Sequence, residues 1–168
     1  MSQEDAPKEF FNDFVQIGVV VRDLDETIKT LSEVFGLGPF RVIDWPPADR
    51  HDIIRLYYGQ PASFTARMAF TELGPIELEL IQPLDGPSIW ADFLAQHGPG
   101  IHHIRFNVTE LEPVVEYLAN HNIPVAQMGS GIRPGTIWAN FATEARVGFT
   151  IEVMKKLPGT DRRTPMIP

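Results

Sequence analysis

Phe14-Val15-Gln16-Ile17-Gly18-Val19-Val20-Val21 is the stretch that decides the fold, because it is a run of β-favouring residues that leads straight into a helix signal. Asp23 follows it, and Glu26 stands three residues further on, the spacing at which the two side chains cap the start of a helix. The apolar face of this helix consists of Ile28, Leu31 and Phe35. Gly36 then ends it, so the sequence predicts a strand followed by an amphipathic helix.

A second copy of this pattern begins at His102-His103-Ile104-Arg105-Phe106-Asn107-Val108, which alternates like a strand. Thr109 and Glu112 form another capping-box signature, which predicts a helix start at this point. The apolar side of the second helix is Val114, Val115 and Leu118. Aligning the ends of the two strands places Gln16 opposite His103, so the chain contains an internal repeat.

Each predicted helix is followed by strand-like runs, at 41–44, 66–72 and 76–81 in the first half and at 136–142 and 148–154 in the second half. Both halves therefore have the order βαβββ, and Glu152 in the last run aligns with Glu79 in the last run of the first half. The predicted organisation is a polar lead, a first module, a linking helix, a second module and a tail, at 1–13, 14–83, 84–99, 100–156 and 157–168. An insertion at 45–64 explains why the first module is longer.

The amino-acid composition restricts the kinds of molecule that the protein can bind. The 168 residues carry 14 basic and 22 acidic side chains and a net charge of −8, which opposes binding to nucleic acid or to an anionic membrane surface. A small molecule is the expected partner. No apolar stretch approaches the roughly 20 residues of a membrane span, and 1–8 is polar and acidic, so we expect a cytoplasmic protein. Without cysteine, any metal must be held by imidazole, carboxylate or amide groups.

Strand alternation predicts one polar face shared by four strands. If Ile17, Val19 and Val21 face the helix, Gln16 faces the other way, and the same rule turns His103, Arg105 and Asn107 away from Ile104, Phe106 and Val108. Glu79 and Glu152 take the same side of their strands. Two interpretations remain open: a half-exposed antiparallel sheet, or a concave sheet in which a cation satisfies both carboxylates. In the second case His103, and not His102, is the predicted ligand, because His102 has the opposite parity.

The run Glu79-Leu80-Ile81-Gln82-Pro83-Leu84, followed by 89–94 and by Gly98-Pro99-Gly100-Ile101-His102-His103-Ile104, resembles the corresponding part of methylmalonyl-CoA epimerases. These enzymes are members of the vicinal oxygen chelate, or glyoxalase-like, superfamily, and the resemblance extends over 14–155. It implies an α+β fold in which two tandem βαβββ modules form a curved mixed sheet, a cup around a metal. It also implies a homodimer.

In this superfamily the metal ligands come from the first and last strands of each module, which correspond here to Gln16, Glu79, His103 and Glu152. Epimerases of this type place His where this chain has Gln16, so the set is instead similar to that of zinc-type glyoxalase I. The resemblance implies one divalent ion per site, Zn, Ni, Co or Mn. The resemblance does not identify the substrate, and a thioester, a hemithioacetal and a hydroxyketone all remain open.

The implied chemistry is proton abstraction next to a carbonyl, as in a metal-dependent isomerase, epimerase or lyase. Glu152 is the expected general base, and Glu79 is expected to return the proton on the opposite face of the substrate. Arg105 and Asn107 are candidates for substrate binding. Extradiol dioxygenases share the fold but use two His and one carboxylate, a set that Gln16 breaks. The alternative is a metal-free protein that binds a drug or aromatic ligand, as bleomycin-resistance proteins do.

Overall fold

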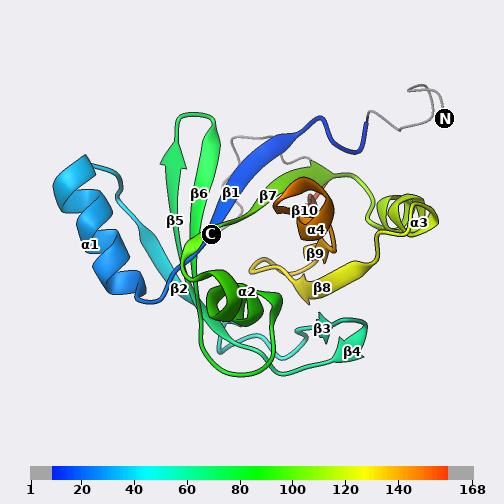
Figure 1. Ribbon diagram of the computed structural model, residues 1–168, viewed down its shortest axis with the longest axis horizontal. Coiled ribbons are helices and arrows are strands. Elements are labelled where there is room, and N and C mark those ends of the chain that lie inside the picture. The colour runs from blue at the N-terminus through cyan, green and yellow to red at the C-terminus, as the bar shows by residue number, and fades with distance from the viewer. Residues whose placement is uncertain (1–8, 159–168) are drawn as a thin grey trace.

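The computed structural model describes residues 9–158, and in it ten strands form one continuous curled sheet (Figure 1). The strand order across the sheet is β2-β5-β6-β1-β7-β10-β9-β8-β3-β4. The strands of the first half are β1 (Phe14–Val20), β2 (Arg41–Trp45), β5 (Ala66–Leu73) and β6 (Ile76–Pro83). Those of the second half are β7 (Gly100–Val108), β8 (Val125–Ser130), β9 (Ile137–Phe141) and β10 (Thr150–Lys155). The α+β class and the paired βαβββ arrangement are confirmed.

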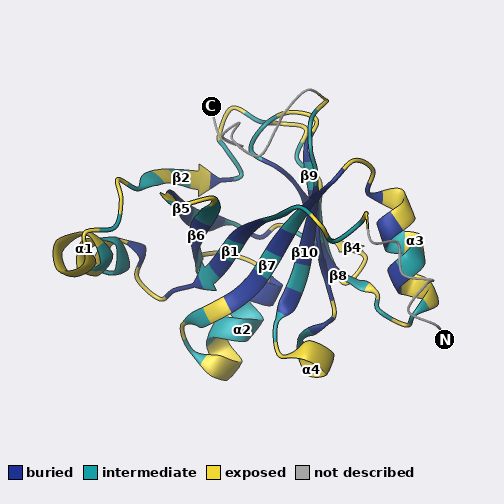
Figure 2. Ribbon diagram, turned by 90° about the horizontal axis from the view of Figure 1, so that it is seen from above, coloured by how far each residue is buried: buried dark blue, intermediate teal, exposed yellow. Residues whose placement is uncertain are grey.

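The two modules meet where the first strand of each lies antiparallel to the other, β1 beside β7. In each module the closing strand lies parallel to the opening one, β6 beside β1 and β10 beside β7. The helices α1 (Leu24–Phe35) and α3 (Glu112–Asn120) lie at the two flanks of the sheet (Figure 2), and α2 (Ile89–His97) lies near its middle, against β6, β1 and β7. All four strands with predicted site residues therefore lie side by side at the centre of the sheet.

The first capping prediction is confirmed and the second is wrong. The Asp23 side chain accepts a hydrogen bond from the backbone N–H of Glu26, and Gly36 ends the helix in the left-handed conformation at φ 68°. In the second module the helix begins at Glu112 without any side-chain cap, so Thr109 does not cap it. Pro113 in the first turn explains the later start, because its fixed φ and missing N–H suit that position.

Several short elements escape the sequence patterns. The strand β8 carries Gln127 and Gly129 and lacks a regular alternation of apolar side chains, and the one-turn helix α4 (Glu144–Val147) precedes β10. Within the 45–64 insertion, β3 (Arg55–Tyr57) and β4 (Gln60–Pro61) form a hairpin, and β3 pairs with β8. The insertion therefore crosses from the first module to the outer edge of the second.

Three apolar clusters hold the sheet in this shape. One lies beneath α1, around Leu24, Leu78 and Leu80, and a second lies beneath α3, around Val114 and Phe141. The third is on the opposite, concave face and is unusually aromatic, with Trp45, Phe64, Trp90 and Trp138 in mutual ring contact. The concave face is thus polar at the four central strands and aromatic beside them, a division that the sequence patterns did not predict.

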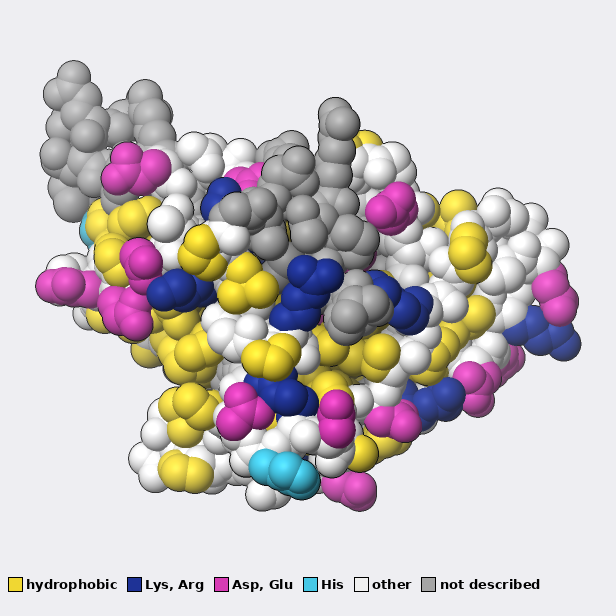
Figure 3. Space-filling view, turned by 180° about the vertical axis from the view of Figure 1, so that it is seen from behind, with side chains coloured by type: hydrophobic (Ala, Val, Ile, Leu, Met, Phe, Trp, Pro, Cys, Tyr) yellow, Lys and Arg dark blue, Asp and Glu magenta, His cyan; other side chains and the backbone are white. Residues whose placement is uncertain are grey.

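The outer surface bears the mixed charge expected from the composition. On the face in Figure 3, Lys and Arg side chains are interspersed with Asp and Glu rather than gathered in one basic area. In the described part of the chain, no helix combines the length and the apolar character needed to cross a bilayer.

The aromatic cluster leaves no room for an added methyl group at Gly129, where a Cβ would lie 2.3 Å from Cζ2 of Trp138. We predict that Gly129→Ala lowers the free energy of unfolding by about 1–3 kcal/mol, the usual effect of overpacking a core. Gly100→Ala is the matched control in another strand, because its Cβ would meet only Phe93, at an ordinary 3.6 Å. Urea denaturation of both variants measures this. Equal stabilities would show that the packing around Trp138 is loose.

Candidate active site

The four predicted ligand side chains come together on the concave face. Gln16 is on β1, Glu79 on β6, His103 on β7 and Glu152 on β10, and each is at least 93% buried. The strand register brings them together because Gly18 pairs with Glu79 on one side and with His103 on the other.

Gly18 has a specific steric role in this arrangement. A Cβ at this position would lie 2.0 Å from Cε1 of His103, so only a glycine lets the imidazole lie across β1. The β1–β7 register also shifts at this point, since Gly18 pairs with His103 and Val19 with Ile101. His102 is the extra residue of this irregularity, and its ring packs edge-on against Phe93 of α2 while His103 faces the cup.

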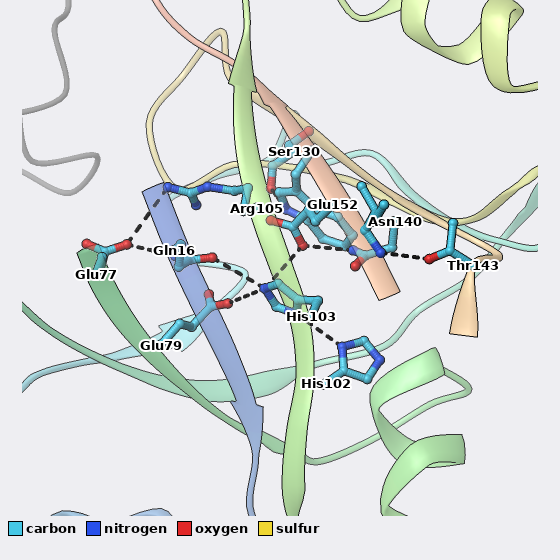
Figure 4. Close-up of polar contacts among 12 residues, drawn as sticks. Gln16, Glu77, Glu79, His102, His103, Arg105, Ser130, Asn140, Thr143 and Glu152 are labelled. Carbon is cyan, nitrogen blue, oxygen red and sulfur yellow. Dashed lines mark hydrogen bonds and ion pairs between the residues drawn. The ribbon is translucent and has the colours of Figure 1, made fainter. Parts of the chain in front are cut away.

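Three oxygen atoms surround Nε2 of His103 (Figure 4). Oε2 of Glu79 is 3.2 Å away, Oε1 of Gln16 is 3.3 Å away and Oε2 of Glu152 is 3.7 Å away. Donors bound at about 2.1 Å to one ion, with angles between 90° and 110°, are separated by roughly 3.0–3.4 Å. The observed separations match or slightly exceed these values.

Neighbouring polar side chains orient the predicted metal ligands by hydrogen bonds. The Nε2 amide of Gln16 donates to Glu77 at 2.7 Å, which leaves its Oε1 turned toward His103. Asn140 donates from Nδ2 to Oε2 of Glu152 at 2.9 Å. Outer partners of this kind fix the rotamer of a ligand and strengthen it as a donor.

His102 performs the same task for His103, because their Nδ1 atoms are 3.0 Å apart. Burial, and secondarily the charge of His103, lower the pKa of His102 well below its ordinary value, so His102 is neutral and its Nδ1 can accept a hydrogen bond from Nδ1 of His103. His103 then carries hydrogen on Nδ1, and its Nε2 is the atom that faces the three oxygens.

The electrostatics of the cup favour a bound cation. Desolvation raises the pKa of Glu152 despite the positive charges of His103 and Arg105, and it raises the pKa of Glu77 despite the charge of Arg105. Burial by itself lowers the pKa of His103, but the Glu152 and Glu79 carboxylates outweigh it, so the net shift is upward. Buried carboxylates that gain protons in this way become ionised when a cation is close.

The residues fit a divalent ion by the chemistry of their donors, one imidazole nitrogen, two carboxylates and one amide oxygen, a set that suits Zn, Mn, Co or Ni. Between residues 9 and 158, no three or more His, Asp and Glu side chains already have the arrangement of a metal site. The carboxylate of Glu152, at 3.7 Å from Nε2 of His103, is the most distant member of the four.

A pocket with about 460 Å³ of empty space, part of it open to solvent, lies beside these residues. Its polar lining includes Glu77, Glu79, Arg105 and Glu152. Asn107 is buried two residues further along β7 and is not part of the lining, so its role in substrate binding stays a prediction.

The apolar lining of this pocket was missed at the level of sequence. It consists of Trp45, Met68, Phe70, Trp90, Ile132, Trp138 and Met154. Strand parity could have identified Phe70, because it pairs with Glu79 across β5 and β6. Trp45 and Trp90 had no such signal, since they reach the pocket from the start of the insertion and from the linking helix.

Comparison with known proteins gives the family. Residues 15–143 match the family described as the Glyoxalase/Bleomycin resistance protein/Dioxygenase superfamily. The chain belongs to this superfamily. The resemblance inferred from Glu79–Leu84 and from the two histidines is thereby confirmed. No curated protein matches the chain.

Several solved structures share the fold at low identity. The hypothetical protein BH1468 of Bacillus halodurans C-125 is 20% identical with a TM-score of 0.61, and the match covers 89% of this chain and 97% of that one. Methylmalonyl-CoA epimerase of Mycobacterium tuberculosis is 19% identical with a TM-score of 0.60, over 91% and 93%. A methylmalonyl-CoA epimerase in complex with methylmalonyl-CoA and NH4+ is 18% identical with a TM-score of 0.58, over 84% and 92%.

The buried histidine and carboxylates predict how the stability of the metal-free protein depends on pH. The raised pKa values of His103 and Glu152 mean that the folded state binds more protons than the unfolded state, so stability falls as pH rises toward the folded-state values. His102 acts oppositely, but only below its unfolded pKa of about 6.5. We predict that the free energy of unfolding decreases from pH 6.5 upward, by at most about 1.4 kcal/mol per pH unit for each group.

Urea unfolding between pH 6.5 and 8.5 in the presence of a chelator measures this slope. The variant His103→Gln removes the imidazole titration and is expected to have a shallower slope. A wild-type stability that is constant or rises over this range would contradict the account of the buried charges.

Proposed function

We propose that this superfamily member is a metal-dependent isomerase, epimerase or lyase that removes a proton next to a substrate carbonyl. The observation that carries the proposal is the set of three oxygens from Gln16, Glu79 and Glu152 around Nε2 of His103, buried at the wall of a pocket that opens to solvent. A divalent ion held by these donors supplies charge that polarises the carbonyl and stabilises the negative oxygen formed when the proton leaves.

Glu152 is the proposed base. It lines the pocket and is buried, so a carboxylate kept ionised by the cation would face the substrate without a full shell of water. The hydrogen bond from Asn140 holds one of its oxygens in place. Glu79 also lines the pocket and is the proposed acid for return of the proton in an epimerisation.

Arg105 is the proposed anchor for an anionic group or carbonyl of the substrate. Its side chain lines the pocket, is 7% exposed, and makes only a loose contact of 3.9 Å from Nη2 to Glu77. Its Nε has no hydrogen-bond partner among the described residues. A substrate oxygen would provide the missing acceptor.

The second candidate function is metal-free binding of an aromatic ligand, which the aromatic lining of the pocket favours. Metal analysis of the purified protein separates the two. About one divalent ion per chain, lost with a chelator together with any activity, supports the enzyme. A protein that binds no divalent ion at micromolar concentration but retains an aromatic ligand supports the binding function.

The enzymatic proposal predicts incorporation of solvent deuterium into a substrate. Zn-loaded protein in deuterated water is incubated separately with methylmalonyl-CoA, with the methylglyoxal–glutathione hemithioacetal and with hydroxyacetone, and the labelled carbon is identified by NMR. Glu152→Gln keeps an oxygen donor and removes the proton acceptor, so the exchange rate should fall by roughly 10²–10⁴ while metal content falls only modestly. An exchange rate that is unchanged in this variant would exclude Glu152 as the base.

A different pattern is predicted for His103→Ala. This change removes the only nitrogen donor, so metal content and exchange should decrease together, and added zinc should restore part of both. Thr109→Ala is a suitable control, because Thr109 is exposed and does not cap its helix. Full metal content in His103→Ala would show that the ion binds elsewhere.

A further inference from the structure

All three tryptophans of the chain line the one pocket beside the candidate metal ligands. They arrive from separate segments: Trp45 at the end of β2, Trp90 on α2 and Trp138 on β9. Each is at least 94% buried, and their ring centroids are 5.5–5.9 Å apart. The small parts of these indoles that remain exposed form an aromatic wall of the pocket.

Hydrogen bonds fix two of the three indole rings. Nε1 of Trp45 and Nε1 of Trp138 both donate to the backbone carbonyl of Ser130, at 3.2 and 3.1 Å. The insertion supports the same wall, since Arg50 donates to the carbonyl oxygen of Ile132 at 2.9 Å and Ile132 itself lines the pocket. The wall is therefore held rigidly from its outer side.

Trp90 differs from the other two. It is 2% exposed, yet its Nε1 has no hydrogen-bond partner among the described residues. Buried N–H groups without an acceptor are uncommon in folded proteins. Trp90 is therefore held in the wall by packing and not by a hydrogen bond from its indole.

The lining of the pocket thus has two chemically distinct parts. One part is the carboxylates and Arg105, and the other is the three indoles with Met68 and Met154. The methylmalonyl group, which the epimerase neighbour binds as its coenzyme A ester, has no ring that could cover such a wall. A flat ring attached close to the reacting carbonyl would cover it.

We propose that the site takes carbonyl compounds that carry an aromatic ring next to the carbonyl, such as aromatic 2-oxo or 2-hydroxy acids and their relatives. The inference rests on the proposed function, because the carbonyl is positioned by the ligand set around His103. The ring stacks on the tryptophan wall, and the polar group faces Arg105.

Benzoylformate is the probe, because it is an aromatic 2-oxo acid without an exchangeable α-hydrogen and binds without turnover. Its affinity for the Zn-loaded protein is compared by calorimetry with the affinities of pyruvate and cyclohexylglyoxylate, which replace the ring by a methyl group and by a saturated ring. We expect benzoylformate to bind at least about tenfold more tightly than pyruvate. It should also bind roughly two- to tenfold more tightly than cyclohexylglyoxylate, because only a flat ring stacks.

Two variants of Trp90 test the wall itself. Trp90→Phe keeps an aromatic face and removes an N–H that has no protein partner, so it should fold normally and keep the preference for benzoylformate over cyclohexylglyoxylate. Trp90→Leu should reduce that ratio toward one. Tryptophan fluorescence is an independent readout, since benzoylformate bound in this pocket should quench the emission.

The outcomes separate this inference from the proposed function. If zinc binds and solvent exchange occurs but benzoylformate binds no better than pyruvate, the ring inference is wrong and the function stands. If zinc does not bind while the preference for benzoylformate remains, the proposed function is wrong and the aromatic wall is supported. If the ratio of the affinities for benzoylformate and cyclohexylglyoxylate were the same in the wild type, Trp90→Phe and Trp90→Leu, Trp90 would not contact the ring of the ligand.

Discussion

The imidazole of His103, buried across Gly18, is the contact on which the rest of the site depends. The absence of a Cβ on β1 lets the ring lie between the two modules, at the junction of β1 and β7. From this position Nε2 faces oxygens contributed by both modules, and Nδ1 faces His102. The site therefore exists only when the two halves of the sheet are joined.

Burial of the charged side chains of this site costs free energy. Hydrogen bonds offset this cost for some of these side chains and not for others. Gln16 and Glu152 each have a hydrogen-bonded partner, in Glu77 and Asn140, whereas Arg105 makes one loose ion pair. The pKa values of Glu77 and Glu152 are raised chiefly because burial removes their carboxylates from water, and the nearby positive charges offset this effect only in part. A divalent cation would stabilise the ionised carboxylates, and a substrate oxygen would provide an acceptor for Arg105.

Much of the architecture could be predicted because the chain repeats itself. The alternation in 14–21 and 102–108 determines which side chains share a face. The repeat aligns Gln16 with His103, and in the structure Oε1 of Gln16 is 3.3 Å from Nε2 of His103. The helix start at Thr109 was wrong because the pattern of the capping box ignores Pro113. The register shift at His102 was also invisible, since alternation assumes an unbroken ladder.

The aromatic half of the pocket could not be predicted from local patterns. Trp45 belongs to a strand end and an insertion with no counterpart in the second module, and Trp90 belongs to the linking helix, which lies outside the repeat. Their meeting with Trp138 depends on the pairing of β3 with β8 and on the position of α2, both of which are long-range contacts. The polar half of the site thus follows from the repeat, and the aromatic half follows from the segments that depart from it.

The central claim is that one divalent ion binds between His103, Gln16, Glu79 and Glu152. Anomalous X-ray scattering from crystals soaked in zinc, recorded above and below the zinc absorption edge, tests it most directly. The account predicts one strong peak per chain, about 2.1 Å from Nε2 of His103 and within coordination distance of oxygens of the other three residues. A peak bound to His102 instead, or no peak at this position while zinc is bound elsewhere on the protein, would contradict it.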